Sequence, residues 1–150
     1  MLNLTEATPN DEPFLFAVYR STKIDEFLLM NVAEEQLHML MHMQFRAQQL
    51  SYRSQYPSAC HRIIQIGNKQ AGYMITYYEN EQVRLVFIAL LPEFRNQGYG
   101  TLVLNQLQQT AHTVSLQVAQ HNPARQWYHR QGFTECAYAP PYVTMQWQRS

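Results

Sequence analysis

The stretch with the clearest chemical meaning is the segment Arg95-Asn96-Gln97-Gly98-Tyr99-Gly100, which joins a predicted strand to a predicted helix. The apolar run from Val83 to Leu91 predicts the strand, and we expect the helix from about Gly100 to His112. The first N–H groups of a helix have no partner inside the helix and carry partial positive charge. The two glycines let the backbone approach a ligand closely. The segment therefore predicts a phosphate or pyrophosphate site made of backbone groups.

Two better-known phosphate motifs are excluded by their spacing. Val103 stands where a Gly-x-Gly-x-x-Gly dinucleotide fingerprint needs its third glycine, and the chain has no Gly-Lys-Ser/Thr P-loop. Two glycines in a turn are also compatible with a purely structural turn. The elements around the loop must decide between these interpretations.

The elements that precede the loop can be predicted from the apolar periodicity. Residues 2 to 8 predict a short strand, and the turn and N-cap chemistry of Thr8-Pro9-Asn10-Asp11 predicts a first helix over 12 to 20. Apolar residues at three- and four-residue spacings predict a second, amphipathic helix over 34 to 52. Three strand candidates separated by short turns then indicate an antiparallel meander: 61–66, 71–78 and 83–91.

The elements that follow the loop indicate a change of strand direction. A strand over 114 to 119 after the helix implies a parallel crossover. Asn122-Pro123 opens a further helix, which Gly132 closes. Two strands, 133 to 138 and 142 to 147, finish the chain. We therefore expect a single α/β (α+β) domain over residues 1–150, with about seven strands and about four helices.

Two motifs resemble those of the GNAT superfamily of N-acetyltransferases. Arg95 to Gly100 matches the family's Arg/Gln-x-x-Gly-x-Gly/Ala signature, at the family's position between the fourth strand and the third helix. Asn122 to Phe133 is similar to its Asn-x-x-Ala-x-x-x-Tyr-x-x-x-Gly-Phe helix, although Ala124 follows Asn122 by two residues. The order of elements from Leu2 to Trp147 is also that of the family, so the resemblance covers essentially the whole chain.

The resemblance implies the GNAT fold, with a central mixed, mostly antiparallel sheet and a splayed parallel strand pair around the cofactor. It implies transfer of the acetyl group of acetyl-CoA to a primary amine by direct attack in a ternary complex. The acceptor amine is not identified. The other possibility is a GNAT-fold protein that binds acyl-CoA without catalysis, as a sensor or interaction protein.

The resemblance also implies roles for particular residues. The backbone around Ile88 would pair with the pantetheine arm and hold the thioester oxygen, the N–H groups of the loop would hold the pyrophosphate, and Tyr128 would protonate the departing thiolate. Tyr128 as a core side chain, Asn122 as a helix cap and Arg95 as a surface charge are the structural alternatives. The cofactor-binding residues so implied are Ile88, Ala89, Leu90, Arg95, Asn96, Gln97, Gly98, Tyr99, Gly100 and Asn122.

The general base is not identified. An amine of ordinary pKa is protonated at pH 7 and must lose a proton before it attacks. Arg84 occupies the strand position where several GNAT enzymes have a glutamate, and Phe87 precedes the Ile-Ala-Leu-Leu-Pro run where relatives often have an acidic residue. The remaining candidates each have a solvated surface charge as the alternative interpretation: Glu79, Glu81, Glu93, Glu135 and His121.

The acceptor site of GNAT proteins is built from the first two helices and their connection. Here that region holds Phe14, Phe16, Tyr19, Phe27 and the segment Met39 to Phe45. Their side chains suggest an apolar or adaptable pocket, with plain core packing as the alternative.

Composition disfavours several other function classes. Eleven basic and eleven acidic residues cancel, which disfavours nucleic-acid and membrane partners. Cys60 and Cys136 each lack a nearby second cysteine, and His38 and His42 lack the glutamate of His-Glu-x-x-His, so we expect buried free thiols and no metal site. With no secretory signal, a cytoplasmic location is expected. A homodimer, common in the family, is left open.

Overall fold

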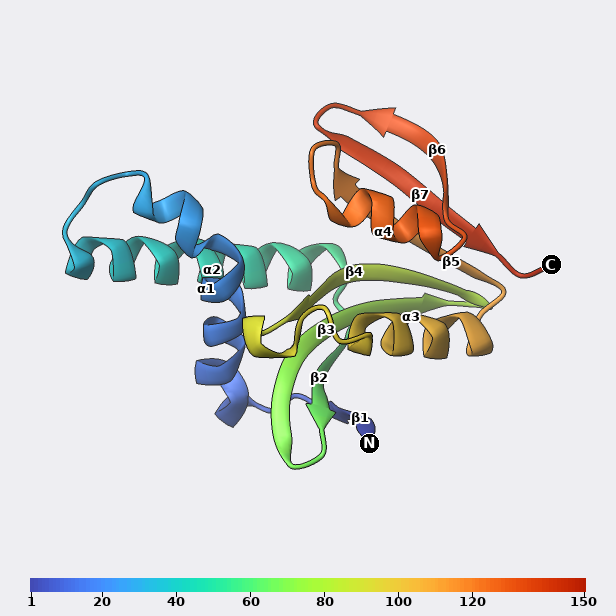
Figure 1. Cartoon of the computed structure of the whole chain (residues 1–150), viewed down its shortest axis with the longest axis horizontal. Helices are drawn as coiled ribbons and strands as arrows, with labels where there is room; N and C mark the ends of the chain where they lie inside the picture. Colours follow the sequence, from blue (N-terminus) through green and yellow to red (C-terminus); the bar gives the residue numbers. More distant parts are fainter. The chain divides into compact units, whose positions relative to one another are not determined.

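The computed structural model describes residues 1–150 and divides them into two compact units. The first consists of Met1–Ile75 and Phe87–Arg95, and the second of Thr76–Val86 and Asn96–Ser150. The chain has four α-helices and a seven-stranded, mostly antiparallel sheet (Figure 1). The predicted fold class is confirmed.

The first unit combines a helical hairpin with a strand pair. Strand β1 (Leu2–Glu6) pairs antiparallel with β2 (Cys60–Ile66), and α1 (Glu12–Leu28) packs against α2 (Glu34–Gln55) after the short 3₁₀ helix η1 (Pro9–Asp11). The helices bury apolar side chains at helical spacing, as the sequence pattern predicted. The buried helical side chains are Leu15, Phe16, Val18, Tyr19, Leu37, Met41 and Phe45.

Helix α1 is longer than predicted, because it continues from Glu12 to Leu28 instead of ending near Arg20. Ser21 and Thr22 favour helix ends, but here their hydroxyls donate to the carbonyls of Val18 and Tyr19, at 2.6 and 2.7 Å. These bonds satisfy the hydroxyls inside the helix. The chain turns only at Asn31, which has a left-handed backbone with φ of 53°.

The second unit is built around β5 (Thr113–Ala119). Strand β7 (Tyr142–Gln148) pairs antiparallel with β5 along its whole length, and β6 (Thr134–Ala139) pairs antiparallel with β7. Helices α3 (Tyr99–Thr110) and α4 (Ala124–Arg130) both contact β5 (Figure 1). The core of this unit includes Val103, Leu104, Leu107, Val114, Leu116, Tyr128, Phe133 and Met145.

The strand order of the sheet is β1-β2-β3-β4-β5-β7-β6. Strands β3 (Lys69–Glu79) and β4 (Gln82–Leu90) each contribute residues to both units. The parallel ladder of β4 with β5 runs from the pair Gln82–Thr113 to the pair Leu85–Leu116, and β4 continues beyond it to Leu90. The predicted parallel strand pair is therefore present, and its ladder covers only the first part of β4.

Thr76, on β3, carries a polar atom that the core leaves without a partner. Its side chain is fully buried, and its Oγ1 makes no hydrogen bond. A Thr76→Val variant is expected to be more stable by about 1 kcal/mol, because it removes a desolvated hydroxyl and keeps the shape. Denaturant unfolding measures this. Thr134→Val is the control, because the Thr134 hydroxyl donates to the Gln146 carbonyl; a loss of stability at position 76 would contradict the prediction.

Candidate functional site

The loop before α3 has the backbone geometry that the glycine pattern predicted. After β4, the 3₁₀ helix η2 (Pro92–Phe94) leads to Asn96 and Gly98, whose φ angles are 61° and 86°. Gly98 caps α3 in the left-handed conformation, and no acidic residue stands in the first turn. The helical bonding starts with the Leu102 N–H, which donates to the Gly98 carbonyl at 3.1 Å. An α-helix supplies no acceptor of its own to the N–H groups of its first turn.

Gly100 has a different role from Gly98. It lies inside α3, and a Cβ built there would meet the ring of Trp127 on α4 at 3.4 Å. Trp127 also donates its indole N–H to the Thr101 hydroxyl at 3.1 Å. Gly100 therefore fits the packing of α3 against Trp127, whereas the positive φ that requires glycine belongs to Gly98.

Arg95, at the start of the loop, makes two hydrogen bonds within the first unit. Its Nε donates to the carbonyl of Leu90 at 2.9 Å, and one terminal nitrogen donates to the hydroxyl of Ser21 on α1 at 3.2 Å. The side chain is exposed and yet bonded at both ends of its guanidinium. Arg95 thus holds the last residue of β4 in place in addition to any role toward a ligand.

The end of β4 lies unusually close to β3. A Cβ on Gly72 would be 3.1 Å from the Leu90 Cα and closer still to the Ala89 carbonyl oxygen, which are backbone atoms that cannot move aside easily. The Leu91 N–H also donates to the Ala71 carbonyl at 2.8 Å. Gly72 is therefore required for the course of the strand that contains Ile88, Ala89 and Leu90.

Asn122 and Tyr128 belong to the second unit. The Asn122 side-chain oxygen accepts the Ala124 N–H at 2.9 Å, two residues ahead at the start of α4, which leaves its amide hydrogens for another partner. Tyr128 is 7% exposed and packs between Trp127 and Phe133, with ring centroids at 4.9 and 5.6 Å. Burial raises the pKa of the Tyr128 phenol to about 12, so the phenol keeps its proton at pH 7.

Residues 57–135 match the sequence model of the acetyltransferase (GNAT) domain, over more than half of the chain. The chain belongs to the GNAT acetyltransferase family. The matched range includes the loop before α3, Asn122 and Tyr128.

Solved structures agree with this family in fold. The PaiA N-acetyltransferase from Thermoplasma acidophilum, solved in complex with coenzyme A, is 16% identical, covers 99% of each chain and gives a TM-score of 0.72. An acetyltransferase from Thermus thermophilus is 20% identical, covers 99% of this chain and 97% of its own, and gives a TM-score of 0.70. No curated protein sequence matches this GNAT chain.

Arg84 and three of the candidate bases of this GNAT protein are engaged in other interactions. Arg84, at the family's glutamate position, donates to the Ser115 hydroxyl at 3.3 Å. Glu81 lies 3.3 Å from His112, and His121 is within hydrogen-bonding distance of Gln120. Glu135 accepts hydrogen bonds from Arg125 and His129, at 2.7 Å each at the closest approach, and these bonds lower the pKa of its carboxyl to about 2. A carboxylate with so low a pKa is a weak base.

Glu135 is expected to give the protein a pH-dependent contribution to stability. Its pKa in the folded state is below the ordinary 4.5, so the stabilisation is present above pH 4.5 and is lost as the pH falls through about 2. The difference in urea midpoint between the parent and Glu135→Gln should therefore shrink over that interval. A difference that stays constant down to pH 2 would contradict this assignment.

The aromatic residues expected near the acceptor are largely core residues. Phe16 and Tyr19 each lie 5.6 Å, ring centroid to ring centroid, from Phe45, and all three are buried. His42 stacks on Phe16 at 3.7 Å. Met39 and Met43, in contrast, are each 64% exposed on α2. The core-packing alternative accounts for the buried members of this set.

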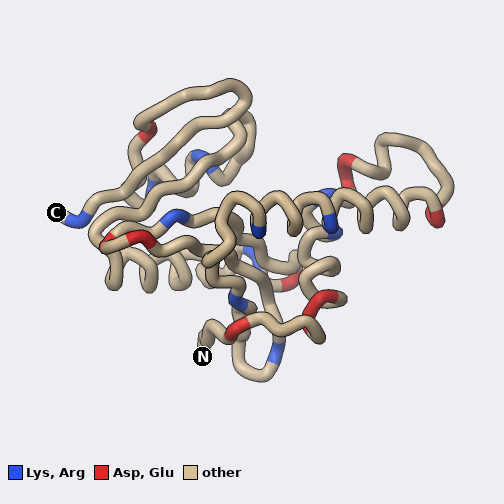
Figure 2. The backbone as a smooth tube through the Cα atoms, turned by 180° about the vertical axis from the view of Figure 1, so that it is seen from behind, with Lys and Arg blue, Asp and Glu red and all other residues tan.

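The remaining residues that could carry other chemistry are scattered. Cys136 is exposed on β6, so the expectation of a buried thiol is wrong there, because every residue of this edge strand is exposed. No group of three or more His, Cys, Asp or Glu side chains is placed to hold a metal ion. None of the helices combines the length and apolar character of a membrane span. Figure 2 shows basic and acidic residues distributed along both units.

Proposed function

We propose that this GNAT protein transfers the acetyl group of acetyl-CoA to a primary amine by direct attack within a ternary complex. One observation carries the proposal: the left-handed turn at Gly98 delivers the chain into α3 with no carboxylate in the first turn. Such a helix N-terminus favours a pyrophosphate through its N–H groups and its dipole. The family match over residues 57–135 supports the same ligand class.

We propose that residues 1–150 act as one domain. Ile88, Ala89 and Leu90 would align the pantetheine arm through backbone hydrogen bonds, as an added strand does. The N–H groups from Asn96 to Gly100, with Gln97 and Tyr99 among them, would hold the pyrophosphate. Arg95 supports this arrangement by bonding the Leu90 carbonyl, and the amide of Asn122 would bond the pantetheine.

In the proposed reaction the neutral amine attacks the thioester carbon, and the Ile88 N–H stabilises the oxyanion of the tetrahedral intermediate. Collapse of this intermediate breaks the carbon–sulfur bond. Tyr128 then gives its proton to the thiolate of CoA, which its high pKa permits because the phenol is protonated at pH 7. As the amide forms, the attacking nitrogen loses one proton, and this proton replaces, through water, the one that Tyr128 gave.

The base that removes the proton of an ordinary, protonated amine before attack is a point where this chain differs from several relatives. Arg84 stands at the family's glutamate position, and the pKa of Glu135 is about 2. We propose that the acceptor is an amine of low pKa, or that water carries the proton to the solvent. A non-catalytic acyl-CoA binder is the second candidate, and the arginine at position 84 is the observation that favours it.

Thiol release measured with acetyl-CoA and a panel of primary amines tests the proposal. The panel should include amines of low pKa, small polyamines, amino acids and peptides with free N-termini. Amine-dependent thiol release with formation of the N-acetyl product is the expected result. Acetyl-CoA binding without any release across the panel would favour the non-catalytic binder.

A further inference from the structure

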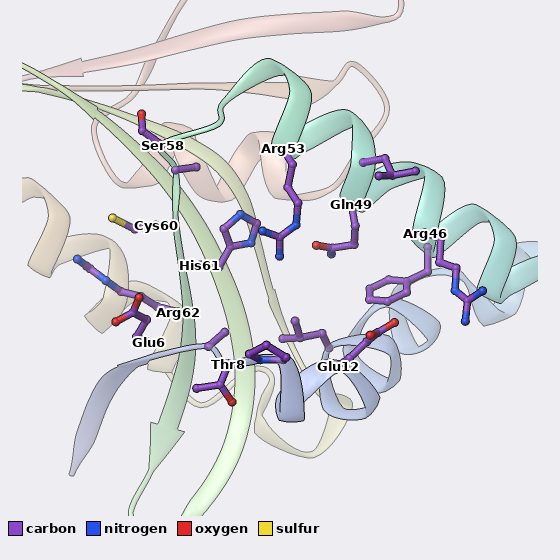
Figure 3. Close-up of a pocket in the computed structure, with 16 residues that line it drawn as sticks. Glu6, Thr8, Glu12, Arg46, Gln49, Arg53, Ser58, Cys60, His61 and Arg62 are labelled. Atoms are coloured by element: carbon purple, nitrogen blue, oxygen red, sulfur yellow. The ribbon is translucent and has the colours of Figure 1, made fainter.

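A groove in the first unit shares no residue with the set proposed to bind acetyl-CoA. It has a volume of about 1130 Å³ and lies between the C-terminal half of α2, the N-terminus of α1 and the facing ends of β1 and β2 (Figure 3). Its floor includes the apolar side chains Leu15, Phe45 and Leu50. This volume is large enough for a small organic molecule.

One side of the groove presents hydrogen-bond donors. Arg53 from α2 and His61 from β2 point toward one another there (Figure 3), and the charge of Arg53 acts on the His61 ring. Arg53 takes part in none of the ion pairs of the chain. A guanidinium has only donors to offer.

The contact behind His61 bears on which of its ring nitrogens carries the hydrogen. Tyr73, which is 2% exposed, has its hydroxyl 2.5 Å from Nδ1 of His61, and the side chain of Gln49 donates to the same hydroxyl oxygen. We assign the Tyr73 hydroxyl as the donor to Nδ1, and in that tautomer Nε2 of a neutral His61 carries the ring hydrogen. Burial is the larger cause and the charge of Arg53 the smaller one that lower the pKa of His61, and both favour the neutral ring.

The other charged residues of the groove nearly balance. Glu6 and Arg62 lie together at one end, and Glu12 and Arg46 lie at the other (Figure 3). Counted with Arg53, three arginines face two glutamates, which leaves one positive charge. That excess favours an anion at the middle of the groove.

We propose that this groove binds a small organic anion. Its carboxylate or phosphate accepts hydrogen bonds from the guanidinium of Arg53 and from Nε2–H of His61. Its apolar body lies against Phe45, Leu50 and Leu15. This site is independent of the proposed acetyl transfer, since none of its residues belongs to the acetyl-CoA set.

Nuclear magnetic resonance of the ¹⁵N-labelled full chain tests the proposal at His61 itself. Phenylbutyrate and phenyl phosphate are the anionic probes, and phenylbutyramide is the neutral comparator of similar shape. We expect a saturable shift of the His61 ring nitrogens with at least one anion at millimolar concentration, and no saturable shift with the amide. The free protein should show the Nε2–H tautomer. A shift with only one of the two anions identifies which head group, carboxylate or phosphate, the groove binds.

Arg53→Gln is the decisive variant, because this exposed residue near the end of α2 can change without disturbing the core. It should weaken binding of the anion at least about tenfold, as expected when a charge-assisted hydrogen bond is lost. Arg20→Gln, an exposed arginine of α1 outside the groove, should bind like the parent. No saturable shift with either anion, equal binding of the amide, or unchanged affinity in Arg53→Gln would each overturn the proposal. Acetyl-CoA binding should persist in Arg53→Gln. A failure of the proposed anion site can therefore be distinguished from a failure of the proposed acetyl transfer.

Discussion

Tyr128→Phe is expected to lower the rate of acetyl transfer about 100-fold or more while acetyl-CoA affinity stays near that of the parent. The phenyl ring keeps the packing against Trp127 and Phe133, and only the proton donor is lost. Without it the CoA thiolate must leave unprotonated or take its proton from water. The effect should therefore appear in kcat and not in the dissociation constant of acetyl-CoA.

Tyr142→Phe provides the matched control for this experiment. Tyr142 lies at the start of β7 and is 49% exposed, so the loss of its hydroxyl should leave the turnover unchanged. Steady-state thiol release and a separate acetyl-CoA titration give the two quantities needed. Full turnover by Tyr128→Phe would show that Tyr128 is not the general acid and is only a core side chain.

Gly98→Ala is expected to weaken acetyl-CoA binding at least about tenfold. Gly98 has a φ of 86°, and an alanine there costs about 1–2 kcal/mol in this region. The loop can relieve that strain only by rotating its backbone. This rotation redirects the N–H groups that are proposed to bind the pyrophosphate of acetyl-CoA. Isothermal titration with acetyl-CoA measures the loss.

Gly67→Ala separates the binding effect from the strain itself. Gly67 also has a positive φ, 61°, and also has open space where a Cβ would stand, but it lies in the turn between β2 and β3. Both variants should lose similar stability, whereas only Gly98→Ala should lose affinity. Equal affinities for acetyl-CoA in the two variants would show that the loop before α3 does not hold the cofactor.

Much of this fold could be predicted because local patterns and global structure agree. Turn and N-cap chemistry predicted the first helix, and apolar spacing predicted the second. Asn122 with Gly132 bounded the helix that became α4. The prediction for α1 ended too early, before Ser21 and Thr22, which are weak helix formers by propensity. In the structure, bonds to the preceding carbonyls and packing on α2 outweigh that propensity.

The contacts that support the candidate site could not be predicted, because they join residues distant in sequence. Arg95 donates to Ser21, and Gly72 is required by the backbone of Leu90. No local sequence pattern indicates either of these contacts. The same is true of the groove, where Arg53 and His61 meet from a helix and a strand. The low pKa of Glu135 likewise depends on Arg125 and His129, which only the folded chain brings to it.

A thermal-shift titration of the full chain with acetyl-CoA, with CoA and NADH as comparators, is the most direct test that this protein binds acetyl-CoA. A ligand that binds only the native state raises stability by about 2.7 kcal/mol at a hundredfold excess over its dissociation constant. A clear, concentration-dependent shift is expected with acetyl-CoA and CoA, and none with NADH. No shift with acetyl-CoA at millimolar concentration would contradict it, because the loop from Arg95 to Gly100 would then not be a working pyrophosphate site.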